Sequence, residues 1–166
     1  MYGCIRCRKI SCIFRSLVMF KYNLFLFKDL PSAWLCGVRV MDLNDKKCII
    51  TVKHNWFNSN PFKSLYWAVQ GMASELATGL AIIDFANKNS LNISMLVVSN
   101  ESKFLKKAKG KIRFECDEVS KIKNSLSSLS EKKKTDKIKL KSTGFDEGGD
   151  IVSEFIYEWS FKLKSI

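Results

Sequence analysis

Apolar and small residues fill one long stretch of the chain, "NPFKSLYWAVQGMASELATGLAII", from Asn60 to Ile83. Its bulky apolar residues recur every three or four positions, a spacing that predicts a long helix with one apolar stripe (Leu65, Val69, Met72, Leu76, Leu80 and Ile83). Asn60-Pro61 is a turn and entry signal, and Ser64 is the expected N-cap. Most other positions are small, so neighbouring elements can approach closely, as in a central helix wrapped by a curved sheet.

Alternating patterns on either side of this helix predict strands. Residues 37–54 indicate two strands joined by a turn at Asn44–Asp45, and Cys48, Ile50 and Val52 share one face of the second. Residues 93–100 indicate a buried strand. Residues 103–118 predict another, with a face formed by Ile112, Phe114 and Cys116.

The C-terminal third predicts a hairpin. Residues 137–145 and 151–163 flank the turn "DEGGD", and one face of the last strand is largely aromatic (Phe155, Tyr157, Trp159, Phe161 and Leu163). Residues 119–129 form a short amphipathic helical pattern, followed by the solvated stretch "SEKKKTDK". Before the first strand, Phe20–Leu30 is helical in pattern up to Pro31, and Ser32–Cys36 forms a short turn.

The element order is therefore a strand pair, a long apolar helix and several antiparallel strands. Strands grouped around one dominant helix are typical of α+β folds. One face of the sheet would pack on the helix, while the edges would need a partner or other cover.

Length and charge narrow the class. The chain has 166 residues, enough for one domain, and 28 Lys and Arg against 16 Asp and Glu give a net charge of +12. That excess indicates an anionic partner: nucleic acid, a membrane surface or a phosphate-bearing small molecule. No nucleic-acid motif is present, so no nucleic acid is expected.

The cysteines give no disulfide framework. Cys4, Cys7 and Cys12 crowd the first dozen residues, while Cys36, Cys48 and Cys116 lie among apolar residues and are expected to be small buried hydrophobes. This usage favours a reducing, cytoplasmic compartment. Cys4 and Cys7 lack the second half of a zinc site and His54 is the only histidine, so no metal site is expected.

The first 18 residues carry Arg6, Arg8, Lys9 and Arg15 and no acid. Their apolar runs are too short for a signal-peptide core, although a transit-like or membrane-touching segment fits them. The preferred hypothesis treats residues 1–18 as an extension, Met19 as the initiator and residues 19–166 as a single domain. Intact-mass measurement of natively expressed protein tests this.

Glu75 is the unusual residue of the apolar helix. A buried ionised carboxylate is costly unless it is paired or hydrogen-bonded, so Glu75 must be compensated or must face a cavity. Leu65–Ile83 is also about as long as a short membrane span, but Gln70, Ser74, Glu75 and Thr78 interrupt it, so no membrane span is expected.

The order of elements and the loop before the helix resemble the hotdog fold of acyl-CoA thioesterases, in particular the phenylacetic-acid-pathway type and related uncharacterised bacterial proteins. The resemblance covers about Phe20 to Lys164. In that type an Asn precedes a His-Gly-Gly turn, and a helix carboxylate follows 15 positions after the Asn. Asn60 and Glu75 keep this spacing, while Tyr66-Trp67-Ala68 replaces His-Gly-Gly.

The resemblance implies a role for each matching residue. Backbone amides of Tyr66, Trp67 and Ala68 would polarise a thioester carbonyl, as in an oxyanion hole. Glu75 would act as general base or nucleophile, and Asn60 would orient substrate or water from the facing subunit. The structural alternatives are a turn role for Asn60, a packing role for Tyr66 and Trp67, and a hydrogen-bonded interface role for Glu75.

The basic segment 102–114 borders the cofactor cleft in relatives, so Lys103, Lys106, Lys107 and Lys109 would receive the phosphates of coenzyme A. The expected protein is an acyl-CoA thioesterase, active as a homodimer or possible tetramer without a cofactor. The alternative is a non-catalytic hotdog protein that binds acyl-CoA or lipid, which the altered His-Gly-Gly turn favours.

Overall fold

The computed structural model of the protein describes residues 5–130 and 133–164. Its helices are α1 (Ile5–Asp29), α2 (Pro31–Leu35), α3 (Trp67–Lys88) and α4 (Val119–Ser127). Its strands are β1 (Arg39–Leu43), β2 (Cys48–Lys53), β3 (Ile93–Phe104), β4 (Lys111–Cys116), β5 (Thr135–Phe145) and β6 (Ile151–Leu163).

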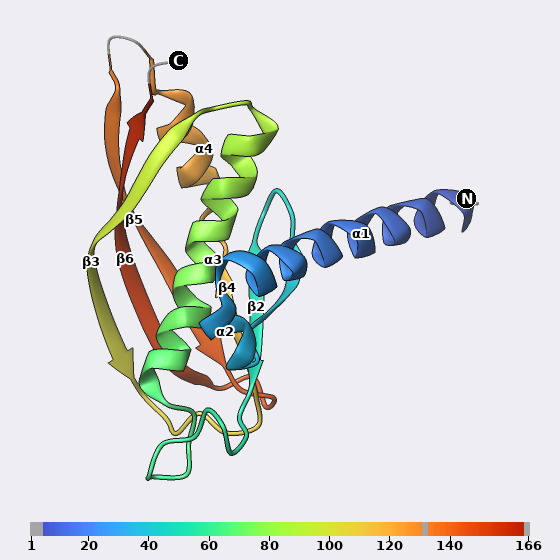
Figure 1. Cartoon of the computed structure of the whole chain (residues 1–166), viewed down its shortest axis with the longest axis vertical. Helices are drawn as coiled ribbons and strands as arrows, with labels where there is room; N and C mark the ends of the chain where they lie inside the picture. The colour runs from blue at the N-terminus through green and yellow to red at the C-terminus, as the bar shows by residue number, and fades with distance from the viewer. Residues whose placement is uncertain (1–4, 131–132, 165–166) are drawn as a thin grey trace.

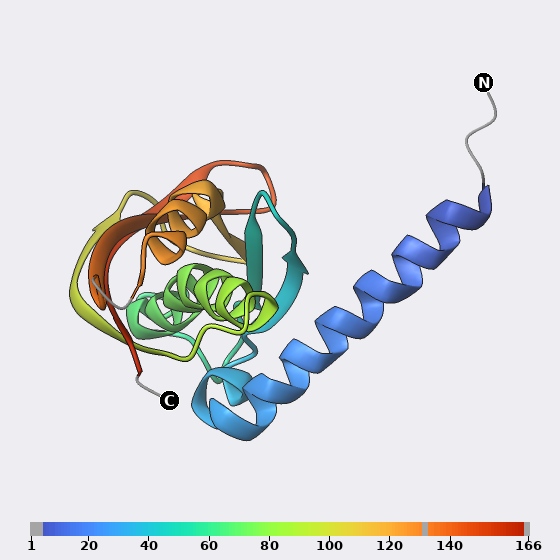
Figure 2. The ribbon, with the colours of Figure 1, turned by 90° about the horizontal axis from the view of Figure 1, so that it is seen from above.

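The six strands form one antiparallel sheet in the order β1-β2-β4-β5-β6-β3, which curves around α3 (Figures 1 and 2). The core lies between the concave face and α3, where Phe114, Phe155 and Phe161 are almost completely buried. The predicted α+β architecture, with a sheet wrapped around one long helix, is therefore confirmed. The two predicted hairpins, β1–β2 and β5–β6, are also confirmed.

Helix α3 begins two residues later than Ser64 predicts. Its N-cap is Tyr66, and Ser64 lies in the preceding loop, where its amide and hydroxyl both donate to Oδ1 of Asn60 at 3.2 Å. The amide of Leu65 donates to the carbonyl of Ala108 at 2.8 Å, which holds this loop against the segment before β4. These two sets of bonds hold the chain in a non-helical loop up to Tyr66, so the N-cap prediction at Ser64 is wrong.

Small residues let α3 approach the sheet, as its composition predicts. A Cβ on Gly79 would lie 3.2 Å from the Trp159 ring of β6, so glycine allows that ring to pack directly on the helix backbone. Ala73 and Ala77 are completely buried on the same helix. Close packing of β6 on α3 follows from the absence of bulk at these positions.

Strand β3 is a sheet edge and not the buried strand that its apolar sequence predicts. It pairs with β6 alone, and the side chains of Leu96 and Val98 are exposed. Ile93, Met95 and Val97 face the core but are only partly buried. The strand also runs on to Phe104, so Lys103 and Phe104 belong to β3, and the next strand begins only at Lys111.

Helix α1 begins at Ile5, earlier than the pattern from Phe20 predicts, and ends at Asp29 before Pro31 as expected. Its C-terminal half packs on the domain through buried Tyr22 and Leu26, and the Tyr22 hydroxyl donates to Oδ1 of Asp84 at 2.7 Å. The N-terminal half projects away from the sheet and α3 (Figure 2). Met19 lies within this helix, and its role as initiator stays a prediction; residues 1–4 lie outside the described part of the chain.

The burial of the cysteines, the exposure of the loop after α4 and the absence of a membrane span are also predicted by the sequence. Cys48 and Cys116 are buried opposite each other on β2 and β4, whereas Cys36 is half-buried; all three are free thiols. The solvated stretch after α4 is exposed at Lys133 and Lys134, and its residues 131–132 lie outside the described chain. Within the described residues, no helix combines the length and apolarity that crossing a membrane requires.

Gly144 in β5 provides a test of the packing. A Cβ at this position would lie 2.7 Å from Cε1 of buried Phe114 and 2.9 Å from Oγ of Ser153. Gly144→Ala is therefore expected to lower the free energy of unfolding by about 1–3 kcal/mol, the usual cost of overpacking a core. The control is Gly71→Ala in α3, where a Cβ meets nothing within 4 Å, and this change should stabilise the helix. Urea unfolding measures both, and a Gly144→Ala variant as stable as the parent would contradict the packing described.

Candidate functional site

The N-terminus of α3 presents unpaired backbone donors. Tyr66 has extended backbone angles, and its amide donates to the carbonyl of Asn58 at 2.9 Å. The amides of Trp67 and Ala68 have no hydrogen-bond acceptor among the described residues. Of the three predicted donors, Tyr66 is thus occupied by the loop, while Trp67 and Ala68 remain available at the positive end of the helix dipole.

Asn58, which the sequence reading did not single out, fixes the loop before the helix. Its side chain is 2% exposed, and its Nδ2 donates to the carbonyls of Cys36 and Lys53, both at 2.9 Å. Its Oδ1 accepts from the amide of Asn55 at 2.8 Å. The side chain of Asn58 therefore positions the end of β2 and the loop, and its backbone carbonyl holds the N-cap residue of α3.

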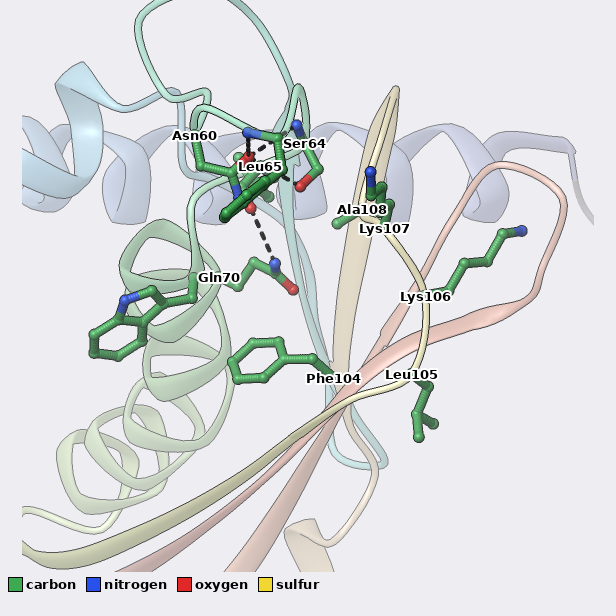
Figure 3. Close-up of a pocket in the computed structure, with 11 residues that line it drawn as sticks. Asn60, Ser64, Leu65, Gln70, Phe104, Leu105, Lys106, Lys107 and Ala108 are labelled. Carbon is green, nitrogen blue, oxygen red and sulfur yellow. Dashed lines mark hydrogen bonds between the residues drawn. The ribbon is translucent and has the colours of Figure 1, made fainter.

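Asn60 is a turn residue with one donor left over. Its Oδ1 accepts from the amides of Phe62 and Ser64 and from the Ser64 hydroxyl, at 3.0–3.2 Å (Figure 3). Its Nδ2 has no acceptor within the described chain. The structural role expected for an Asn before Pro61 is therefore present, and it leaves the amide group free to donate to a ligand.

Asn60 and Trp67 line the same cavity. This cavity has a volume of about 550 Å³ and lies between the loop before α3 and the segment that follows β3 (Figure 3). Lys106 and Lys107 also line it, so it brings four of the predicted site residues together. Tyr66, Ala68, Lys103 and Lys109 are not among its lining residues.

Gln70 forms the polar floor of this cavity. It is 5% exposed, and its Nε2 donates to the carbonyl of Leu65 at 3.1 Å (Figure 3). Its Oε1 accepts from the Ser153 hydroxyl at 2.8 Å. Both ends of the amide are satisfied within the protein. Gln70 therefore fixes the cavity wall between α3 and β6.

The four predicted lysines differ in their partners. Lys106 donates to Asp146 at 2.6 Å and to Asp150 at 2.7 Å, and these bonds raise the pKa of Lys106 and lower that of Asp146. Lys103 lies 3.8 Å from Glu101, a weak exposed pair. Lys107 and Lys109 are exposed and have no ion pair with any described residue. The available positive charge is therefore greatest at Lys107 and Lys109.

Glu75 faces an apolar cavity of about 250 Å³. Helix α3 supplies half of the lining residues, the segment from α1 through α2 supplies Phe25, Leu30, Ser32 and Ala33, and the sheet supplies Met95 and Trp159. In the single chain Glu75 is exposed, so it is not the buried group that the apolar sequence around it predicts. The apolar walls nevertheless remove part of its hydration, and this desolvation raises the pKa of Glu75.

Strand β6 fixes the helical turn that carries Glu75. The Tyr157 hydroxyl lies 2.7 Å from the Ser74 hydroxyl and donates to the carbonyl of Gly71 at 3.2 Å. One turn further along, Nε1 of Trp159 donates to Thr78 at 3.0 Å, and Thr78 donates to the carbonyl of Glu75 at 2.8 Å. The buried polar residues of α3 are therefore paired with β6.

Ser74 and Thr78 use their hydroxyls in bonds to β6 and to the helix backbone, so neither bonds to the Glu75 carboxylate. Burial and the nearby Glu75 carboxylate raise the pKa of Tyr157 to about 12, so this hydroxyl stays protonated. The Glu75 carboxylate itself has no hydrogen bond or ion pair with any described residue. An unpaired carboxylate with a raised pKa in a cavity is typical of a catalytic acid or base.

Within one chain, Glu75 and the free amides of α3 do not meet. Trp67 and Glu75 are eight residues apart on the same helix, which corresponds to about 12 Å along its axis. They also line different cavities. A site that uses both groups therefore needs them from two different chains.

Comparisons with known proteins address the fold. No family model matches the chain, and no curated protein matches its sequence. A protein of unknown function from Chlorobaculum tepidum superposes with a TM-score of 0.77 at 15% identity, over 90% of this chain and 97% of that one. A probable thioesterase from Pseudomonas aeruginosa gives 0.73 at 19% identity, over 87% and 96%. The chain has the hotdog fold of thioesterase-like proteins.

A third solved structure with a similar fold is a thioesterase from Staphylococcus aureus, with a TM-score of 0.58 at 12% identity over 75% of this chain and 93% of that one. Two structures of that protein carry alanine in place of a glutamine and of a glutamate, which are 15 positions apart in its sequence. Asn60 and Glu75 have the same separation in this hotdog chain. The resemblance to the phenylacetic-acid-pathway type in particular stays a prediction.

Proposed function

We propose that this protein is an acyl-CoA thioesterase that acts as a homodimer, with Glu75 of one chain facing the α3 N-terminus and Asn60 of the other. The observation that carries the proposal is the unpaired Glu75 carboxylate in an apolar cavity, on the same helix as two unpaired N-terminal amides. The separation of 15 positions between Asn60 and Glu75 supports it, because the replaced residues of the Staphylococcus aureus thioesterase share it.

Strand β3 is the proposed dimer contact. It is 12 residues long, it ends the sheet, and one of its edges has no partner strand in the described chain. A long edge with exposed apolar side chains such as Leu96 and Val98 is a site where another chain adds to a sheet. Pairing of two β3 edges would bury this strand and bring the two α3 helices onto the same side of a continuous sheet.

The chemistry assigns one role to each group. The carbonyl oxygen of the thioester accepts from the Trp67 and Ala68 amides, which stabilise the negative charge that develops on it. Glu75 removes a proton from the attacking water, the carbon–sulfur bond breaks, and coenzyme A leaves as a thiolate that takes up this proton. In the alternative route Glu75 attacks the carbonyl and displaces the thiolate, and water then hydrolyses the resulting anhydride to the free acid and the Glu75 carboxylate. Both routes need the ionised carboxylate. The acyl group occupies the apolar cavity beside Glu75, and the phosphates of coenzyme A meet Lys107 and Lys109.

A non-catalytic acyl-CoA binder is the second candidate, and Trp67 is the observation that favours it. Its large side chain lines the cavity at the position where the resemblance places glycine, and 56% of it is exposed. A side chain of that size can limit the approach of a thioester carbonyl to the amides while leaving room for the rest of the ligand.

Thiol release from a panel of acyl-CoA thioesters of different chain lengths tests the proposal, with size-exclusion chromatography and light scattering for the oligomeric state. The proposal predicts turnover of at least one member by a dimer. Saturable binding of acyl-CoA without thiol release supports the binder. Neither binding nor turnover by a folded dimer would refute both functions.

The proposed contact of Lys107 and Lys109 with the phosphates of coenzyme A makes a separate prediction. A Lys107→Ala/Lys109→Ala double variant should raise KM several-fold at low ionic strength and leave kcat unchanged, because these lysines attract the phosphates and do not touch the reacting carbonyl. Added salt should shrink the difference. The control is Lys139→Ala on β5, an exposed lysine outside the cavity. Equal effects of the control and the double variant on KM would contradict the assignment.

A further inference from the structure

Helix α1 has two apolar faces, and only one of them packs on the domain. The inner face includes buried Tyr22 and Leu26. The outer face is an apolar stripe of Leu17, Phe20, Leu24 and Phe27, which are 62%, 69%, 54% and 56% exposed. Their spacing of three and four residues places them in one row along the helix. No described residue outside α1 and α2 covers this row.

Helix α2 extends the stripe into a shallow groove. The Trp34 ring meets Phe27 edge-on with 5.0 Å between ring centroids, and the Arg39 guanidinium lies over the Trp34 ring, 4.4 Å from its centroid. Together with Phe20, Asn23 and Leu24 these rings line an open groove of about 310 Å³. Contacts among Phe27, Trp34 and Arg39 therefore hold the Phe27 and Trp34 rings in place.

Basic residues accompany the stripe. Lys21 and Lys28 are exposed and, at 100° per residue, lie beside Leu17 and Leu24 on the helix surface. Helix α1 contains six basic residues and one acidic residue, Asp29 at its C-terminal end, in a chain with a net charge of +12. A helix with an apolar row bordered by lysines is typical of segments that lie in the surface of an anionic bilayer.

The size of the stripe argues against a second copy as its occupant. Aromatic side chains present about 150–250 Å² each, so at these exposed fractions the stripe offers roughly 400 Å², whereas a stable protein interface needs about 800 Å² per partner. A bilayer requires no complementary shape, and partial insertion of three or four apolar side chains is enough for reversible binding when positive charge assists.

We propose that the outer face of α1, from Leu17 to Phe27, is a docking surface for an anionic lipid bilayer. The helix lies parallel to the membrane, with Phe20, Leu24 and Phe27 inserted among the lipids and Lys21 and Lys28 at the headgroups. This surface is distinct from the β3 edge and from the Asn60 cavity, and it operates whether or not the protein hydrolyses thioesters.

Vesicle co-sedimentation of the full chain tests this. The probes are vesicles of phosphatidylcholine alone and of phosphatidylcholine mixed with phosphatidylglycerol. The wild-type protein should bind the mixed vesicles at least several-fold more strongly, and less so as salt is added. A Phe20→Ser/Leu24→Ser/Phe27→Ser variant should lose most of this binding even at low salt. A Lys21→Gln/Lys28→Gln variant should lose only the preference for the anionic lipid.

The matched control is Trp56→Ser/Phe57→Ser, which removes two exposed aromatic side chains (91% and 60% exposed) from the loop after β2. It should bind like the wild type. Circular dichroism and thermal unfolding check that each variant is folded. The proposal is overturned if mixed vesicles capture no protein or if the control variant loses as much binding as the stripe variant. It is equally overturned if the stripe variant, on size-exclusion chromatography, dissociates a wild-type oligomer.

Discussion

Replacing Glu75 with glutamine is expected to lower kcat for thioester hydrolysis by about 10²–10⁴-fold, the usual contribution of a general base. The amide has nearly the same shape as the carboxylate but cannot accept a proton or attack a carbonyl. The Glu75 side chain has no hydrogen bond or ion pair with the described residues, so the substitution breaks no contact within the chain. Thiol release under saturating acyl-CoA measures the effect.

The raised pKa of Glu75 gives this variant a second signature. Because the folded protein binds the Glu75 proton more tightly than the unfolded chain, the wild type loses stability as pH rises through the interval from the unfolded pKa to the folded one. Glutamine has no such loss. Glu75→Gln should therefore unfold at a higher temperature than the wild type at pH 7, with the difference disappearing below about pH 4.

The same titration shapes the activity profile. The reaction needs ionised Glu75, so the acidic limb of kcat against pH should lie above the ordinary glutamate value of 4.5. The matched control is Glu147→Gln in the exposed β5–β6 turn, which makes the same change of charge and should keep full activity. A folded Glu75→Gln variant that keeps wild-type kcat would contradict the catalytic role, and an unfolded one would contradict the absence of contacts at Glu75.

Trp67→Pro is expected to lower kcat by about 10²–10³-fold, which is the range measured when one oxyanion-hole donor is removed. Proline removes the backbone N–H that lacks an acceptor, and it is tolerated at the first position of a helix. The preceding residue, Tyr66, has φ −60° and ψ 137°, the extended conformation that proline favours before it. Stability should therefore change little, which thermal unfolding checks.

Trp67→Ala separates the donor from the side chain. It keeps the N–H and removes the ring, so it should retain turnover, and it should increase it if the ring limits access to the amides. A large loss in Trp67→Ala equal to that in Trp67→Pro would assign the effect to the ring and remove the argument for the amide. Steady-state kinetics with one acyl-CoA substrate compares the three proteins.

The sequence predicts the helix and the sheet because their residue periodicities are strong. The stripe from Leu65 to Ile83 and the alternation of Phe155, Tyr157 and Trp159 each match one kind of element. The boundaries were less predictable. Ser64 has the chemistry of an N-cap, but its bonds to Asn60 and the bond from Leu65 to Ala108 delay the helix. The second of these joins residues 43 positions apart, which no local pattern reveals.

The apolar run in β3 shows a second limit. Residues 93–98 are as apolar as a central strand, yet β3 lies at the edge of the sheet. An apolar sequence indicates that a strand is buried, but it does not show whether the same chain or a second chain buries it. If two chains pair along β3, as we propose, Leu96 and Val98 are covered in the dimer. Sequence alone does not distinguish burial within a chain from burial between chains.

The candidate site was predictable in part. The spacing of Asn60 and Glu75 pointed to both residues, and Ser74 and Thr78 stood out as polar positions in an apolar helix. Their partners Tyr157 and Trp159 lie about 80 residues later, and no local pattern links them. The occupation of the Tyr66 amide by Asn58, and the neutralisation of Lys106 by Asp146 and Asp150, likewise depend on tertiary contacts.

Mixed dimers of Glu75→Gln and Trp67→Pro chains test most directly whether each site is shared between two chains. Each parent homodimer lacks one essential group at both sites. In a heterodimer, one site receives Glu75 from one chain and the Trp67 amide from the other, so a statistical mixture of chains should recover about a quarter of the wild-type activity. Thiol release after co-refolding, compared with the two parents refolded separately, gives the answer. Recovery near a quarter supports the shared site, and activity no greater than that of the parents would contradict it.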